Sequence, residues 1–97
     1  MSRAFVNEDG PDGPAPRFRL PDRDDPAFAR AAAEVLLDAA DRGETAAAEE
    51  ATGYAFGSVA LVEEMQAILR EARVRHQDRR EQLAERFLRR AGVEVAE

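Results

Sequence analysis

The side chains of this sequence offer few of the combinations that catalysis uses. There is no cysteine and His76 is the only histidine, so thiolate and multi-histidine metal sites are excluded. His76 stands alone among arginines, and no nucleophile can be paired with it. The adjacent acids Glu49-Glu50 and Glu63-Glu64 remain, but neighbours on a helix point about 100° apart, so each pair offers one carboxylate to a site. We therefore expect no catalytic residue, no metal, no cofactor and no enzymatic activity.

Charge is distributed unevenly along the chain. The net charge of −6 argues against general binding to nucleic acid. Residues 70–90 nevertheless hold eight arginines against four acids. On a helix, Glu71 reaches Arg75 and Glu85 reaches Arg89 at the favourable spacing of four residues, whereas Glu81 has no such partner. A solvated helix surface is the first interpretation of this cluster, an acidic protein partner the second and nucleic acid the third.

The segment 50–57 combines aromatic residues with glycines. Tyr54 and Phe56 lie beside Gly53 and Gly57, where one helix gives way to the next. One interpretation is that the two rings cover the core at this turn. The other is an exposed aromatic corner that binds a ligand or a partner.

Helical periodicity positions these residues from residue 26 onward. Asp25 followed by Pro26 is a typical helix start, and Gly43 is a typical stop, so we predict a first helix over 26–42. Its apolar face is formed by Phe28, Ala32, Val35, Leu36 and Ala39. Thr45 then caps a shorter helix that ends at Gly57. Its predicted apolar face is Ala47, Ala51, Tyr54 and Ala55.

A third helix follows, with Ser58 as its cap and Glu63 and Glu64 complementing the dipole of its first turns. Its buried face is predicted to be Leu61, Met65, Ile68, Leu69 and Ala72. Either it runs unbroken over 59–91, or it breaks near 76–78, where Asp78 and Glu81 resemble a capping box. We favour the break. Apolar periodicity then resumes at Leu83, Ala84, Phe87, Leu88 and Ala91, before Gly92.

A faint internal repeat is consistent with the break. At an offset of 33 residues Leu36 and Ala39 match Leu69 and Ala72, and Gly43 aligns with His76. Ala51 and Tyr54 likewise match Ala84 and Phe87. Two stacked helical hairpins would produce such a pattern, and so would chance matches between alanine-rich helices of the same period.

These elements predict an all-α fold, a small bundle of three to four helices built as two helical hairpins. Residues 10–26 contain all five prolines, so we expect a disordered N-terminal arm over 1–25, a helical domain over 26–92 and a tail over 93–97. No apolar run is long enough to span a membrane, so we expect a soluble, cytoplasmic protein. The few large apolar residues suggest self-association through residues 59–91 as an alternative role.

The first nine residues provide the most specific signal of the sequence. Residues 2–9, S-R-A-F-V-N-E-D, resemble the N-terminal leader of bacterial Gre-type transcript-cleavage factors, which is close to S-R-A-F-V-K-E-D. The stretch Glu50-x-x-x-Tyr54-x-Phe56-Gly57 is similar to E-x-x-x-Y-x-Y-G near the coiled-coil tip of that family.

The resemblance implies a shared partner more than a shared activity. In Gre factors an aspartate lies three residues before the tip glutamate and both acids serve a metal, whereas Ala47 stands three residues before Glu50 here. We therefore expect a non-enzymatic interaction module with RNA polymerase as the protein partner, and no direct contact with nucleic acid or membrane. The residues expected to bind the partner are Arg3, Phe5, Val6, Glu50, Tyr54 and Phe56. An accessory factor that lends Glu50 to a partner's metal is a further alternative.

Overall fold

The computed structural model describes residues 18–95, so predictions for the leader and for residues 96–97 lie outside the described residues. The described part contains four α-helices, one 3₁₀ turn and no strand, which confirms the all-α prediction. The elements are α1 (Phe28–Arg42), α2 (Thr45–Thr52), the 3₁₀ turn η1 (Val59–Leu61), α3 (Val62–Val74) and α4 (Asp78–Arg90).

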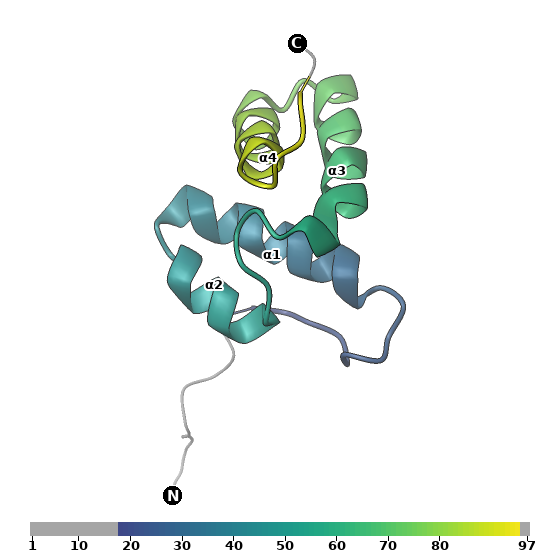
Figure 1. Ribbon diagram of the computed structural model, residues 1–97, viewed down its shortest axis with the longest axis vertical. Coiled ribbons are helices and arrows are strands. Elements are labelled where there is room, and N and C mark those ends of the chain that lie inside the picture. Colours follow the sequence, from purple (N-terminus) through teal and green to yellow (C-terminus); the bar gives the residue numbers. More distant parts are fainter. Residues whose placement is uncertain (1–17, 96–97) are drawn as a thin grey trace, which may run out of the picture.

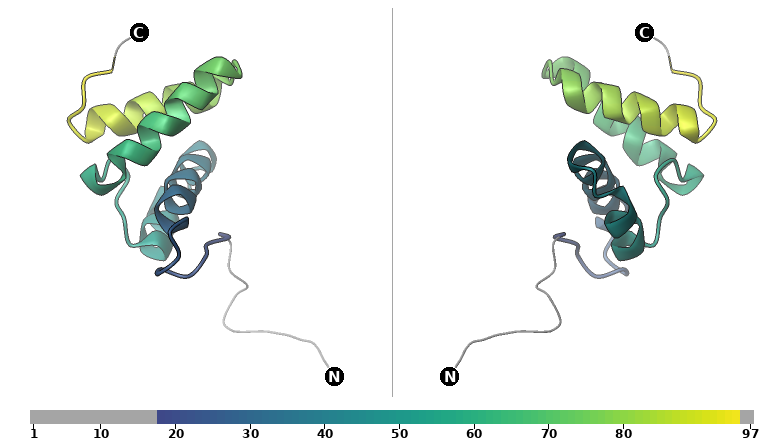
Figure 2. Two further views of the ribbon diagram at one scale, coloured as in Figure 1. Left: turned by 90° about the vertical axis from the view of Figure 1, so that its right-hand side faces the viewer. Right: turned by 90° about the vertical axis from the view of Figure 1, so that its left-hand side faces the viewer.

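The helices form two hairpins, α1–α2 and α3–α4, stacked on each other (Figure 1). α1 is the shared element, because it packs against α2, α3 and α4. Within the described residues α2 contacts no helix other than α1. Figure 2 shows the α3–α4 hairpin lying across α1 from above, with α2 on the far side of α1.

The core lies where the apolar faces of α1, α3 and α4 meet. The apolar face predicted for α1 is confirmed except at Val35, which is only half-buried. The apolar face predicted for α3 is buried at every position. Phe87 is completely buried in α4, beside Leu88. The buried apolar residues are Phe28, Ala32, Ala33, Leu36, Leu37, Ala39, Ala48, Phe56, Leu61, Met65, Ile68, Leu69, Ala72, Leu83, Ala84, Phe87 and Leu88.

α1 begins at Phe28 rather than at the predicted residue 26, and its N-cap is Ala27, which makes no side-chain capping bond. The Asp25 carboxylate accepts a hydrogen bond of 2.8 Å from the Ala27 backbone N–H, and the Asp25 carbonyl accepts one from Phe28. Residues 26 and 27 form a turn, and regular helix begins at Phe28. Asp25 therefore caps the turn that precedes α1, and the prediction that it is the N-cap of the helix itself is wrong.

α2 differs from its prediction in length and in its buried face. It ends at Gly53, which has a φ of +81°, rather than at Gly57. Ala48 and Thr52 form its buried face, so the expected face through Ala47, Ala51 and Ala55 is wrong. The helix ends at Gly53 because this residue adopts the left-handed conformation, with its N–H donating to the Glu49 carbonyl. Thr52 can be buried on the inner face because its hydroxyl donates to the Ala48 carbonyl at 2.9 Å and accepts from the Tyr54 N–H at 3.1 Å. The Thr45 cap is also wrong, because Glu44 precedes the helix without a side-chain capping bond.

The long C-terminal stretch is broken where the sequence analysis favoured a break. Ser58 accepts from the Ala60 N–H at 3.3 Å, as predicted, and the helix continues through η1 into α3. α4 then begins at Asp78. The predicted capping box is not formed, since Gln77 holds the cap position and no side chain caps the helix. The break instead results from the way in which α3 ends.

α3 ends in a Schellman motif centred on His76. The Gln77 N–H donates to the Ala72 carbonyl at 2.9 Å and the His76 N–H donates to the Arg73 carbonyl at 3.3 Å. His76 has a φ of +57°, the left-handed conformation that this motif requires. Gly43 occupies the equivalent position after α1, with a φ of +74°.

The internal repeat therefore has structural content in its first half. Gly43 and His76 both reverse the chain, and Leu36, Leu69 and their matched alanines are all buried. The second half does not correspond, because Ala51 is exposed whereas Ala84 is buried. The two hairpins correspond in their first helices, α1 and α3, and in the turns that follow these helices. Their second helices, α2 and α4, do not correspond.

Replacing His76 with glycine is expected to raise the free energy of unfolding by about 0.5–1 kcal/mol, because a side chain in the left-handed region strains the backbone. Urea denaturation followed by circular dichroism at 222 nm measures the change. Gly43→Ala is the matched control, since it places a Cβ at the equivalent position, and it should lower the stability by about 1 kcal/mol. Loss of stability in His76→Gly would contradict the argument.

The ends of the described chain pack on the helices. Phe18 and Leu20, which the sequence analysis placed in the arm, are half-buried against the core. The Arg23 guanidinium lies 5.3 Å from the centroid of the Phe28 ring, and it donates to the Thr52 carbonyl at 3.4 Å. At the other end, residues 93 and 95 are half-buried valines that contact the core. Residues 18–25 and 93–95 thus belong structurally to the helical body.

Candidate interaction surface

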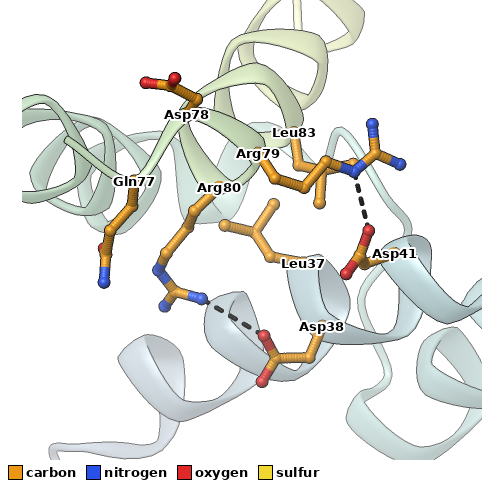
Figure 3. Close-up of a pocket in the computed structure, with 8 residues that line it drawn as sticks. All are labelled: Leu37, Asp38, Asp41, Gln77, Asp78, Arg79, Arg80 and Leu83. Atoms are coloured by element: carbon orange, nitrogen blue, oxygen red, sulfur yellow. Dashed lines mark hydrogen bonds and ion pairs between the residues drawn. The ribbon is translucent and has the colours of Figure 1, made fainter.

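The arginines at the start of α4 are paired with acids of α1. Arg79 Nε lies 2.7 Å from Asp41, and Arg80 lies 3.3 Å from Asp38 and 3.5 Å from Glu34. Figure 3 shows two of these pairs across an open depression of about 360 Å³. The depression is lined by Leu37, Asp38, Asp41, Gln77, Asp78, Arg79, Arg80 and Leu83. The pairs connect the two hairpins, and each partly exposed pair contributes about 0–1 kcal/mol.

A second group of ion pairs also connects helices. Arg30 of α1 donates two hydrogen bonds to Glu71 of α3, at 2.7 and 3.2 Å. These bonds hold the pKa of the Glu71 carboxyl below its ordinary value. Arg73 bridges α3 to Glu85 and Glu81 of α4, at 3.0 and 3.3 Å. The sequence analysis looked for partners of these acids within one helix, whereas the packing brings arginines of neighbouring helices to them.

Four arginines of the predicted cluster form no ion pair with any described residue, namely Arg70, Arg75, Arg86 and Arg90. Arg70 and Arg75 are exposed on α3 and at its end. Arg86 and Arg90 lie one helical turn apart on the second half of α4. The first half of α4 therefore binds α1, and the second half presents two unpaired cations.

Arg86 and Arg90 line one wall of an open groove between α2 and α4, of about 490 Å³. The residues that line this α2–α4 groove are Ala40, Thr45, Ala46, Glu49, Phe56, Arg86 and Arg90. Ala46 and Glu49 come from α2, on the opposite wall from the arginines. The groove thus combines small apolar side chains with charges of opposite sign on its two walls.

Close contacts hold the groove residues in place. The Glu49 carboxylate accepts a hydrogen bond of 2.8 Å from the Phe56 N–H, which fastens the loop after α2. Gly57 has a φ of +94°, and a Cβ built on it would lie 2.7 Å from Cγ of Arg90. The stem of Arg90 therefore passes directly over Gly57, and only a glycine leaves room for it.

The two aromatic residues that the sequence singled out lie against the core. Phe56 packs edge-on against Phe87, with ring centroids 4.9 Å apart, and it is 9% exposed. Tyr54 is half-buried, with its ring centroid 6.3 Å from that of Phe28. These placements favour the interpretation in which the rings cover the core. Phe56 also lines the α2–α4 groove, so both interpretations apply to it in part.

The structure does not bring all predicted partner-binding residues together. Glu50 is exposed on α2 but does not line the groove, and Tyr54 does not line it either. Arg3, Phe5 and Val6 lie outside the described residues. Phe56 is thus the one predicted residue that the fold places beside the unpaired arginines of α4.

The sequence analysis treated the arginine cluster as one block and missed the division within it. A local signal was present in the residues one helical turn away from each arginine. Four residues from Arg86 lie Gln82 and Arg90, and the residues three and four positions before Arg90 are Phe87 and Arg86. Neither arginine has an acid on its own helix face within α4. The groove beside them had no sequence signal.

No group of three or more metal-ligating side chains gathers anywhere within residues 18–95. Of the helices in that range, none combines the length and the apolar character that crossing a membrane requires. Comparison with known proteins found no matching family model, no matching curated protein and no matching solved structure.

Proposed function

We propose that this chain is a non-enzymatic protein-interaction module of the bacterial cytoplasm, and that its partner belongs to the transcription machinery. The observation that carries the proposal is the unpaired arginine pair of α4 beside a groove with Phe56 at its base. Cations that the fold leaves without acids, next to an apolar side chain, are typical of a surface that a partner completes.

The leader supports the choice of partner. Residues 2–9 resemble the leader of Gre-type factors, and they precede a body whose helices do not form a long coiled coil. A leader of this kind on a different body fits a module that shares a binding partner with those factors and has another effect on it.

Self-association receives less support from the packing. The alternative depended on a thin core and on apolar residues of 59–91. Most of those residues are buried inside one chain, among them Met65, Ile68 and Phe87, and the large apolar residues left exposed are Val59 and Val74. The apolar residues that a dimer interface would require are therefore already packed in the core of one chain.

The transcription partner is tested by retention of purified bacterial RNA polymerase on the immobilised full chain. We expect retention, and we expect Phe5→Ser with Val6→Ser to weaken it at least about tenfold, because burial of each apolar side chain contributes about 1.5–3 kcal/mol. A chain with residues 2–9 in scrambled order keeps the composition and serves as the control. Equal retention of the scrambled chain, or no retention at all, would remove the transcription machinery as the partner.

A further inference from the structure

We propose that the α2–α4 groove binds an acidic, amphipathic helical segment of a partner protein, with two carboxylates on Arg86 and Arg90 and an apolar side chain against Phe56. The inference rests on the proposed function, because it names the chemistry of the partner that the module would bind.

The arginine wall sets the spacing of the acids. Arg86 and Arg90 are four residues apart on α4, and side chains at this spacing are about 5–6 Å apart at their Cβ atoms. A partner helix with acids four residues apart presents carboxylates at the same separation. Each guanidinium can then receive a carboxylate through two parallel hydrogen bonds, the strongest ion-pair geometry in proteins.

This wall is pre-organised for binding. Phe87 and Leu88 lie between the two arginines in the sequence, and both are buried, so they fix this part of α4 on the core. The stem of Arg90 lies on Gly57, so part of the conformational entropy of this side chain is already lost in the free protein. Ordering of Arg90 therefore costs less on binding, whereas exposed Arg86 is positioned only through its place on α4.

The opposite wall restricts what can bind. Glu49 faces the arginines across the groove, and its carboxylate is fixed by the Phe56 N–H. A ligand with negative charge on all sides, such as a nucleic acid backbone, would meet this carboxylate as well as the arginines. A helix with acids on one face avoids that repulsion by turning them toward α4, so Glu49 favours the acidic helix over a polyanion.

The apolar part of the groove accepts a side chain rather than a whole helix. The whole groove has a volume of about 490 Å³, and Ala40, Ala46 and Phe56 are its apolar lining. The alanine side chains are small, and Phe56 is 9% exposed, so the apolar space available is that of one side chain. A leucine-sized side chain between the two acids of the partner fits this space and supplies the apolar contact that exposed ion pairs alone do not.

The test measures binding of a fluorescein-labelled synthetic helical peptide to the full chain by fluorescence anisotropy at low salt. The peptide carries two glutamates four residues apart and a leucine between them on the same face. We expect Arg86→Glu with Arg90→Glu to weaken binding at least about tenfold, since the double reversal replaces two attractive charge pairs by two repulsive ones. Arg70→Glu with Arg75→Glu is the matched control, because it changes the net charge equally at two other unpaired arginines, and it should change binding by less than about twofold.

A charge exchange makes the test independent of folding defects. A peptide with lysines in place of both glutamates is expected to bind the Arg86→Glu, Arg90→Glu chain and not the unaltered one. Three results would overturn the proposal: no binding of the glutamate peptide, equal binding of a glutamine version, or equal weakening by the control pair. Complete displacement by a single-stranded oligonucleotide at equal concentration would also overturn it. The polymerase experiment with the scrambled leader is read separately, so failure of that partner and failure of the groove are distinguishable.

Discussion

Replacing Phe87 with alanine is expected to lower the free energy of unfolding by about 3–5 kcal/mol. The ring is completely buried, and its edge contact with Phe56 joins α4 to the loop that follows α2. Alanine removes this contact and leaves a cavity that the surrounding helices can close only in part. A domain of this size has a total stability of about 5–10 kcal/mol, so the variant should be largely destabilised. Urea denaturation with circular dichroism at 222 nm measures the loss.

Val74→Ala is the control for Phe87→Ala. Val74 is also an apolar residue near a helix end, but it is 78% exposed, so its truncation should change the stability by less than about 0.5 kcal/mol. Similar losses in the two variants would show that Phe87 does not occupy the core. A large loss in Phe87→Ala alone would confirm the position of α4 from which the groove is built.

Replacing Gly57 with alanine is expected to lower the free energy of unfolding by about 2–3 kcal/mol. Two effects add together, since the φ of +94° is unfavourable for any residue with a Cβ, and the new methyl group would lie 2.7–3.0 Å from the stem of Arg90. The atoms in its way are Cβ, Cγ and Cδ of Arg90, which cannot move far while α4 stays in place. Thermal or urea denaturation of the variant measures the sum of the two effects.

Gly92→Ala separates them. Gly92 has a similar φ of +89°, and nothing lies within 4 Å of a Cβ built on it, so its substitution measures the backbone effect alone. We expect Gly57→Ala to cost about 1 kcal/mol more than Gly92→Ala. Arg90→Ala should remove only part of that difference, because it deletes Cγ and Cδ of Arg90 but keeps the Cβ that lies 2.9 Å from the new methyl group. Equal losses at both glycines would contradict the close approach of Arg90 to Gly57.

Local signals in the sequence explain why most of the fold was predictable. The end of α1 followed from Gly43 and the start of the next helical segment from Ser58, because both effects act over three or four residues, whereas Asp25 located the start of α1 only approximately. The core faces of α1, α3 and α4 followed from the period of their apolar residues. The prediction for α2 was wrong because alanines on all sides of a short helix define no face, and because Gly53, in the left-handed conformation, ends the helix before Gly57.

The candidate site was less predictable, since it depends on helices that are distant in sequence. Phe56 was identified from its place between glycines, but its neighbours Arg86 and Ala46 reach the groove only through the stacking of the two hairpins. The ion pairs were unpredictable for the same reason, because their partners come from different helices. Glu71 pairs with Arg30 of α1, and Glu85 pairs with Arg73 of α3.

The sequence by itself determined the helical class, the two hairpins and most of the buried faces of α1, α3 and α4, because apolar periodicity acts within a few residues along one helix. Tertiary structure alone decided which arginines of 70–90 are neutralised. Arg79 and Arg80 face the acids of α1, whereas Arg86 and Arg90 lie two turns further along α4, beyond those acids and above Phe56. Whether a surface cation is paired depends on what lies across the gap between helices, and only the packing of the two hairpins sets that distance.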